Sequence, residues 1–390
     1  MIELRTWIAT WGTAQQLAPP AEPGGGPQMP DFPDDEPPAG PPEKVSAQTV
    51  RMVARATVGG SAVRVALANS FGNAPVHIGA ARIDGHRLTF GGRTSVVLPT
   101  GAQISSDPLD HHVRAQTDLV VSLYVPGENV TPTTHEVGLR TGWVAPGDQT
   151  AERDLRDATE FRSYLWLAGI DVVAEPAAAA IVVLGDSVVD GMETTPDADA
   201  PWPSVLARRL AARPDLPPRA VLNMGIAGNR VLRETDGMGA AAPARFDRDV
   251  LARPGVRWVV VSEGLNDIFF GSFPGVPESE RATAEDLIAG YRLLIARAHL
   301  HRLRIVGCTL LPIGSTPFFT PETEQVRQEV NSWIRGSGEF DAVADLEAAT
   351  HDPAAPACVR PELLSGDNVH PNDAGQRVIA EAFDLEIFRG

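Results

Sequence analysis

Four short polar segments of the sequence carry side chains that could together perform nucleophilic catalysis. They are Gly185-Asp186-Ser187, the stretch from Gly225 to Asn229, Gly264-Leu265-Asn266-Asp267, and the segment from Asp367 to His370. A serine hydroxyl is a weak nucleophile until a base removes its proton, and imidazole is the usual base near neutral pH. The sequence therefore offers Ser187 as a nucleophile and His370 as its base.

The remaining members of such a site are also present. His370 needs a carboxylate that fixes its tautomer, and Asp367, three residues earlier on a tight turn, can reach the other ring nitrogen. Attack on an ester carbonyl creates an oxyanion, which needs preorganised hydrogen-bond donors. We expect an oxyanion hole made by the backbone NH groups of Ser187 and Gly228 and by the side-chain amide of Asn266.

These four segments belong to the second half of the chain, residues 174–390, where apolar strands alternate with helices. We expect strands at 181–185, 220–226, 257–264, 304–312 and 342–346, and helices at 202–213, 244–252, 284–299, 321–335 and 372–383. This alternation predicts an α/β domain with a flavodoxin-like, doubly wound parallel sheet. Ligands bind beyond the carboxyl ends of the strands in such sheets, so the polar segments should meet at one rim.

The first half, residues 1–173, has short strands and many turns. Alternating apolar and polar residues on both sides of Gly59-Gly60 predict a hairpin, and further strands are expected at 76–83, 94–99, 117–126 and 163–173. This pattern favours an antiparallel β-sandwich of the jelly-roll kind. An insert rich in Pro, Gly and acidic residues, 18–43, is expected to be an extended surface loop, with a tolerated insertion favoured over a lid.

With these motifs in this order, the chain resembles the SGNH hydrolases, also called GDSL esterases and lipases. The segments "PWPSVLARRLA", "DLIAGYRLLIARAH" and "LANSFGNAPVHIG" are similar to a bacterial two-domain branch of that family, with a β-rich first domain. The resemblance implies Ser187 as nucleophile, Asp367 and His370 as its partners, and Gly228 and Asn266 as oxyanion donors. Many relatives are exported, and the absence of a signal peptide here is a departure from them.

Composition excludes several other classes of protein. The formal charge of −17, from 33 basic and 50 acidic residues, disfavours nucleic acid as a partner. No apolar stretch approaches the length of a membrane span. As written, the sequence indicates a cytoplasmic protein, or an extracellular one if a presequence has been removed. The two cysteines, Cys308 and Cys358, form no zinc motif, and a single bridge between them stays open.

Two further groups of residues lie near the expected rim. Asp186, Asp190, Glu263 and Asp267 would make it acidic, but no histidine accompanies them at ligand spacing, so we predict no metal and no other cofactor. The second group, Phe269, Phe270, Phe318 and Phe319, could form an acyl pocket that binds substrate, and core or loop packing is an equal alternative.

The sequence thus predicts a metal-independent serine hydrolase that cleaves short-chain carboxylic esters through an acyl-enzyme. Acetyl esters of carbohydrates are one candidate class of substrate. A longer-chain lipase is the rival within the same class, although no amphipathic lid helix is evident. The rival from another class is a carbohydrate-binding protein with an inactive hydrolase domain, which a missing motif residue would have favoured.

Overall fold

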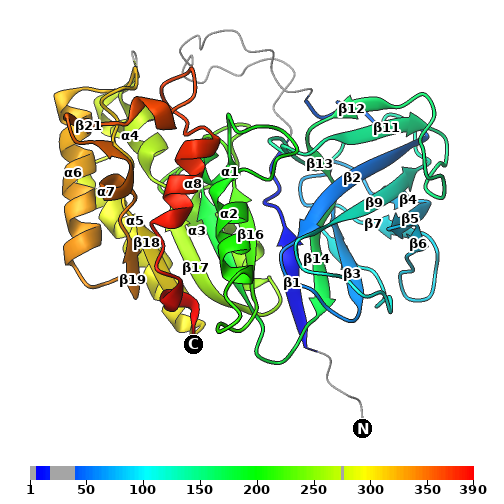
Figure 1. Cartoon of the computed structure of the whole chain (residues 1–390). Helices are drawn as coiled ribbons and strands as arrows, with labels where there is room; N and C mark the ends of the chain where they lie inside the picture. Colours follow the sequence, from blue (N-terminus) through cyan, green and yellow to red (C-terminus); the bar gives the residue numbers. More distant parts are fainter. Residues whose placement is uncertain (1–5, 18–39, 274–275) are drawn as a thin grey trace.

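A computed structural model describes residues 6–17, 40–273 and 276–390 (Figure 1). Residues 18–39, which make up most of the predicted insert at 18–43, lie outside the described residues. Within the described ranges, no helix is both long enough and apolar enough to cross a bilayer.

The second half is built on a five-stranded parallel sheet. Its strands are β15 (Ala179–Gly185), β16 (Arg219–Gly225), β17 (Val256–Ser262), β18 (Arg304–Cys308) and β19 (Ala342–Ala344). They lie in the order β16-β15-β17-β18-β19, and every pairing is parallel. Counted along the chain this order is 2-1-3-4-5, the flavodoxin-like arrangement. The prediction of a parallel sheet is therefore confirmed. Every residue of β15, which pairs with a strand on each side, is buried, as its apolar run requires.

Helices follow most of these strands. They are α1 (Ser187–Asp190), α2 (Trp202–Ala211), α3 (Ala242–Phe246), the π-helix η1 (Asp247–Leu251), α4 (Leu265–Gly271), α5 (Ala284–Leu300), α6 (Pro321–Gly336), α7 (Leu346–Thr350) and α8 (Asp373–Glu381). Short 3-10 turns η2 (Glu278–Glu280), η3 (Pro361–Leu363) and η4 (Leu385–Phe388) and a small hairpin, β20 (His351–Asp352) with β21 (Ala355–Val359), complete this half. All five predicted helical segments are helical, whereas the shorter helices α1, α4 and α7 were not predicted.

Local chemistry explains where the longer helices begin and how they pack. Thr283 starts α5 and Thr320 starts α6, each with a side chain that accepts a hydrogen bond from the third residue of its helix. Helices α2 and α8 lie side by side, as Figure 1 shows, and the ring of Trp202 stacks on that of Phe383 with centroids 5.0 Å apart. This contact holds α8, and with it the loop that precedes α8, against α2.

The first half consists of antiparallel strands. One sheet has the order β1 (Trp7–Gly12), β14 (Leu167–Val173), β3 (Val63–Ala68), β8 (Gln103–Ser105). A second has the order β12 (Thr159–Phe161), β11 (Gly142–Pro146), β2 (Gln48–Ala56), β9 (Thr117–Val125), β5 (Ala80–Ile83), β6 (His86–Arg87). Two small pairs join β4 (Val76–Ile78) to β7 (Val96–Leu98) and β10 (Thr134–His135) to β13 (Tyr164–Leu165). The sandwich arrangement of these sheets stays a prediction.

The hairpin predicted around Gly59-Gly60 is wrong. Its two strands exist as β2 and β3, but β2 pairs with β9 and β11, whereas β3 pairs with β14 and β8. Gly60 instead exchanges backbone hydrogen bonds with Val113, and a Cβ at this position would meet the carbonyl oxygen of Val173 at 2.6 Å. The two glycines therefore allow close approach of other segments as the chain passes from one sheet to the other.

The two halves meet along β1 and β16, which lie next to each other in Figure 1. The backbone NH of Ala9 donates to the carbonyl oxygen of Pro254 at 2.9 Å, and the NH of Val221 donates to the hydroxyl of Thr57 at 3.2 Å. The predicted domain boundary, at residues 173 and 174, falls between the end of β14 and the start of β15. The division into two domains stays a prediction.

Candidate active site

Ser187 lies directly beyond the carboxyl end of β15, as the first residue of the short helix α1. Asp186 precedes it in an extended conformation, and its carboxylate accepts a hydrogen bond from the backbone NH of Val188 at 3.0 Å. A Cβ at Gly185 would meet the carbonyl oxygen of Ser262 at 2.3 Å. Only glycine therefore allows the strand to pass this close to its neighbour and turn sharply enough to present the hydroxyl of Ser187.

The loop before α8 brings His370 to this serine, although 183 positions separate the two residues in the sequence. The Nε2 atom of His370 lies 2.9 Å from the Oγ atom of Ser187, and its Nδ1 atom lies 2.5 Å from a carboxylate oxygen of Asp367. Because Asp367 can only accept, Nδ1 carries a proton and Nε2 of the neutral ring is left to accept the serine proton. The predicted trio is thus hydrogen-bonded in series.

Asp367 is itself held by the loop it belongs to. Its other carboxylate oxygen accepts hydrogen bonds from the Ser365 hydroxyl at 2.6 Å and from the backbone NH groups of Val369 and His370 at 2.8 and 2.9 Å. Burial alone would raise the pKa of this carboxyl, but the hydrogen bonds and charge of His370 lower it below the ordinary value. Asp367 is therefore an ionised partner for an imidazolium across the neutral pH range.

The expected oxyanion donors come from two other strand ends. Gly228 follows β16 with a φ of +77°, and a Cβ there would meet the sulfur of Met238 at 2.3 Å, so the loop requires glycine. Asn266 lies in the first turn of α4, where one NH of its side-chain amide donates to the carbonyl oxygen of Asn229 at 3.0 Å. The second amide NH remains available. Among the described residues, neither the Ser187 nor the Gly228 backbone NH has a hydrogen-bond acceptor.

Arg245 forms hydrogen bonds with the strand ends and loops that carry these residues. It was not identified from the sequence. Its fully buried guanidinium donates to the backbone carbonyls of Gly185 and Met224 at 2.9 and 2.6 Å, and to the side-chain oxygen of Asn229 at 2.9 Å. These bonds tie the end of β15 to the end of β16. Its place in a helix between two strands gives no pattern that could have identified it.

The four acidic residues expected to make an acidic rim are buried instead. Asp186, Asp190, Glu263 and Asp267 are all less than 5% exposed. Asp186 caps α1, and Asp267 accepts the backbone NH groups of Val231 and Leu232. Burial raises the pKa of both carboxyls to about 6. Asp186, Asp190 and Asp267 therefore hold loops and a helix start, and the prediction of an acidic rim is wrong.

No metal-binding cluster is present in the part of the chain that the structure describes, since no three His, Cys, Asp or Glu side chains gather closely enough. The metal-free interpretation stays a prediction. Cys308 is buried and Cys358 is partly buried, and both are free thiols, so the bridge left open by the sequence is not formed.

The structure separates the four phenylalanines of the expected acyl pocket. Phe269, Phe270 and Phe318 are buried, whereas Phe319 is 41% exposed. The rings of Phe269 and Phe318 stack with centroids 4.5 Å apart, and Phe273, which the sequence did not single out, contacts Phe270 and Phe318. Phe269 lies one helical turn after Asn266 on α4, so the cluster borders the expected oxyanion hole on that side. Its role in substrate binding stays a prediction.

Ionisation of the buried Glu263 makes the stability of the folded protein depend on pH. Glu263 is buried at the end of β17, and neither carboxylate oxygen has a hydrogen-bond partner among the described residues, with Arg245 3.7 Å away. Burial raises the pKa of Glu263 from its ordinary 4.5 to about 8, although the charge of Arg245 opposes the shift. The folded chain binds this proton more tightly than the unfolded chain, so stability falls as pH rises from about 4.5 to about 8.

We therefore expect the variant Glu263→Gln, which cannot ionise, to gain stability relative to the parent across that pH range. The difference should be of the order of a few kcal/mol, given about 1.4 kcal/mol per pKa unit. Urea unfolding at several pH values from 5 to 9 measures it, and the exposed substitution Glu128→Gln serves as the control. Parallel stability curves for the parent and Glu263→Gln would contradict this assignment.

Comparisons with known proteins show which family and which proteins this chain is similar to. The model of the GDSL-like lipase/acylhydrolase family matches residues 183–378, just over half of the chain. An acetylxylan esterase from Geobacillus stearothermophilus is 25% identical over 222 residues, which are 53% of this chain and 93% of that protein.

Solved structures are also similar to the second half. A variant of an acetyl xylan esterase from Geobacillus stearothermophilus is 23% identical with a TM-score of 0.41, over 53% of this chain and 93% of its own. A G-D-S-L family protein from Desulfitobacterium hafniense is 21% identical with a TM-score of 0.38, over 52% of this chain and 97% of its own. On the evidence of the family model, the chain belongs to the GDSL-like lipase/acylhydrolase family and is a carboxylic ester hydrolase.

Proposed function

We propose that this chain is a metal-independent serine esterase that cleaves short-chain carboxylic esters, acetyl esters of carbohydrates among them, through an acyl-enzyme on Ser187. The observation that carries the proposal is the 2.9 Å contact between the Ser187 hydroxyl and Nε2 of His370, with Asp367 on the opposite ring nitrogen. This arrangement supplies a nucleophile, a base that can accept its proton, and a carboxylate that stabilises the imidazolium.

The acylation step follows from these contacts. The Ser187 oxygen attacks the carbonyl carbon of the ester while its proton moves to Nε2 of His370, which gives a tetrahedral oxyanion and an imidazolium. Asp367 stabilises the positive ring through the Nδ1 proton. When the tetrahedral species collapses, the bond to the alcohol oxygen breaks and Nε2 returns its proton to that oxygen. The alcohol leaves, and the acyl group stays on Ser187.

Deacylation repeats the same steps with water as the nucleophile. Nε2 of His370 takes a proton from water as it attacks the acyl-enzyme, and the proton then passes to the Ser187 oxygen as the carboxylic acid leaves. Both tetrahedral species place negative charge on the former carbonyl oxygen. The NH groups of Ser187 and Gly228 and the free amide NH of Asn266 are the donors proposed to receive it.

Two observations support short acyl groups and acetylated sugars. The rings of Phe269, Phe270, Phe273 and Phe318 pack against one another, and two of them belong to the helix that carries Asn266, which favours a short acyl pocket over a long tunnel on this side. The similarity to an acetylxylan esterase over 93% of that protein supports acetyl groups on a carbohydrate as the substrate class.

Replacement of the nucleophile is the first test of the mechanism. We expect Ser187→Ala to lose several orders of magnitude in kcat while it stays folded, since removing the nucleophile disables the whole set of interacting groups. Hydrolysis of 4-nitrophenyl acetate measures the loss, with circular dichroism to check folding. Ser332→Ala, an exposed position on α6, should retain the parent rate. A Ser187→Ala variant with substantial activity, after repeat purification, would rule out the acyl-enzyme.

Asn266 tests the oxyanion hole separately from the nucleophile. Asn266→Ala should lower kcat by about 100- to 1000-fold, the loss typical of one oxyanion donor, and leave KM nearly unchanged. Steady-state kinetics on the same ester separates the two constants. If KM rose while kcat stayed intact, Asn266 would bind substrate in the ground state and would not stabilise the oxyanion.

The length of the acyl chain tests the substrate class. Each methylene that fits a pocket adds about 0.8 kcal/mol of binding, and methylenes beyond the pocket add nothing. We therefore expect kcat/KM across 4-nitrophenyl esters, from acetate to palmitate, to be highest at the short chains. Detergent controls are needed for the solubility of the long esters. A maximum at long chains would favour the lipase alternative and leave the roles of Ser187, Asp367 and His370 unchanged.

A further inference from the structure

A buried histidine of the first half contacts the short helix that carries Ser187. His135, the last residue of β10, places its Nε2 atom 3.0 Å from a carboxylate oxygen of Asp190, the last residue of α1. The side chains are only 5% and 2% exposed. We call this contact the His135–Asp190 bridge, and it joins two segments that lie in different halves of the chain.

The surroundings of His135 require a proton on both ring nitrogens. Its Nδ1 atom lies 2.7 Å from the backbone carbonyl oxygen of Ala14, which can only accept a hydrogen bond. Its Nε2 atom faces a carboxylate. Burial alone would lower the pKa of His135, but the charge and hydrogen bond of Asp190 and the carbonyl of Ala14 raise it above the ordinary value. The bridge is therefore an imidazolium paired with a carboxylate.

Asp190 also binds the loop that carries Gly228, an expected oxyanion donor. Its second carboxylate oxygen accepts the backbone NH of Ala227 at 3.0 Å, and Ala227 directly precedes Gly228. The side-chain amide of Asn223 also donates to the backbone carbonyl of Val189 at 2.7 Å and, more weakly, to that of Asp190 at 3.3 Å. One carboxylate thus connects the helix that begins at Ser187 with the residue before Gly228.

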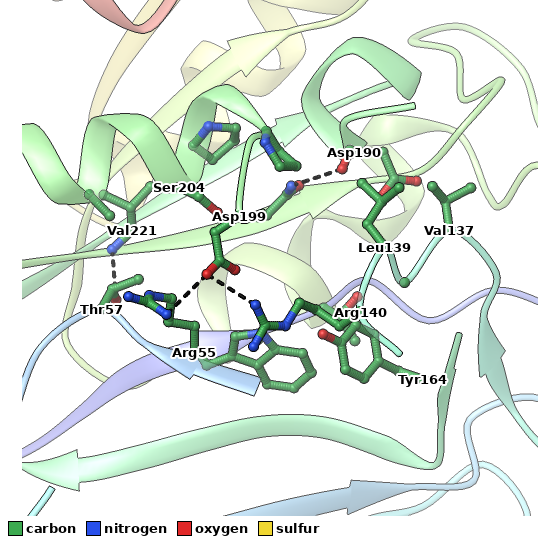
Figure 2. Close-up of a pocket in the computed structure, with 18 of the residues that line it drawn as sticks. Arg55, Thr57, Val137, Leu139, Arg140, Tyr164, Asp190, Asp199, Ser204 and Val221 are labelled. Carbon is green, nitrogen blue, oxygen red and sulfur yellow. Dashed lines mark hydrogen bonds and ion pairs between the residues drawn. The ribbon is translucent and has the colours of Figure 1, made fainter. Parts of the chain in front are cut away.

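The His135–Asp190 bridge borders a cavity on one side. His135 and Asp190 both line a cavity of about 90 Å³ between the two halves. Figure 2 shows Asp190 across this cavity from Tyr164 and Arg140 of the first half, and Arg55 and Arg140 bind Asp199. The hydrogen bonds of Asp190 therefore hold its side chain at the wall of a cavity.

We propose that His135 is a positioning residue for ester hydrolysis, which acts from the first half of the chain by holding Asp190 and, through it, the spacing between Ser187 and the NH of Gly228. This inference rests on the oxyanion role proposed above for Gly228. Without the imidazolium, the buried Asp190 carboxylate loses its charged partner and turns away, and the Ala227–Gly228 segment loses its anchor. The first half of the chain then contributes to the reaction without contacting the substrate.

The test compares variants that break the bridge with one that preserves its hydrogen bonds. His135→Ala and Asp190→Ala should each lower kcat for 4-nitrophenyl acetate by about 10- to 100-fold, as expected for a displacement of about 1 Å at a reacting centre, with KM within about twofold. Asp190→Asn can still accept from Ala227 and can donate to a neutral His135, so it should retain kcat within a few-fold. Thr57→Val removes a hydrogen bond between the halves away from Asp190 and should match the parent.

Two further measurements separate positioning from a loss of folded protein. Rates are expressed per active site, titrated with a fluorophosphonate, and affinity for a phenylboronic acid should fall in parallel with kcat, because its tetrahedral adduct uses the oxyanion donors. If His135→Ala does not fold, the double variant His135→Leu/Asp190→Leu replaces the bridge by an apolar pair, a change that buried ion pairs often tolerate. It should fold and show the same loss in kcat.

A bridge variant that folds and keeps the parental kcat and boronic acid affinity would overturn the positioning role of His135. So would equal losses for Asp190→Asn and Asp190→Ala, because the conservative variant retains the hydrogen bonds. Either result leaves the proposed function intact as long as Ser187→Ala is inactive. A fully active Ser187→Ala would instead overturn the proposed function itself.

Discussion

The site depends on one buried guanidinium. Arg245 has no exposed surface, and it donates to the carbonyl oxygens at the ends of β15 and β16 and to the side chain of Asn229. A charge in this position is costly unless it is paired, and the carboxylate of Asp249, 3.3 Å away, supplies the pairing. Ligands bind at the carboxyl ends of parallel strands, and Arg245 adds hydrogen bonds to carbonyl oxygens at two of these ends.

The rest of the site is arranged around that anchored edge. Ser187 leaves β15 in a turn that only glycine at position 185 allows, and His370 reaches it from the loop before α8. The buried acids Asp186, Asp190 and Asp267 bind backbone NH groups of the same loops. Each of these loops is therefore held by hydrogen bonds to a buried charged or polar side chain. Such contacts keep the site preorganised before a substrate binds.

Sequence patterns predicted what depends on local periodicity and chain order. The strands of the parallel sheet are continuous apolar runs, so their alternation with helices was sufficient to predict the sheet and the edge where Ser187 meets His370. The Gly59-Gly60 hairpin was wrong because alternation identifies two strands without naming their partners. Helix α4 was missed because "GLND" has the composition of a turn, whereas the buried residues after it continue as a helix.

Contacts between distant segments could not be predicted in the same way. Whether Asp190 would face solvent or His135 depends on how the two halves pack, and a histidine within a β-rich segment has no distinguishing pattern. The acidic residues were expected on a rim because their types are usually exposed, yet neighbouring NH groups and arginines allow their burial. Similarly, the stacking of Phe269 on Phe318 depends on a contact between helix α4 and the separate loop that precedes α6.

The central claim is that Ser187 is the nucleophile of an ester hydrolase, and direct covalent labelling tests it. An organophosphonate reacts with an activated serine and stays attached, so digestion and mass spectrometry of the treated protein identify the residue. We expect a single adduct on Ser187 in the parent and none on that peptide in a His370→Ala variant treated briefly under the same conditions. Labelling of a different serine in the parent, with Ser187 unmodified, would show that Ser187 is not the nucleophile.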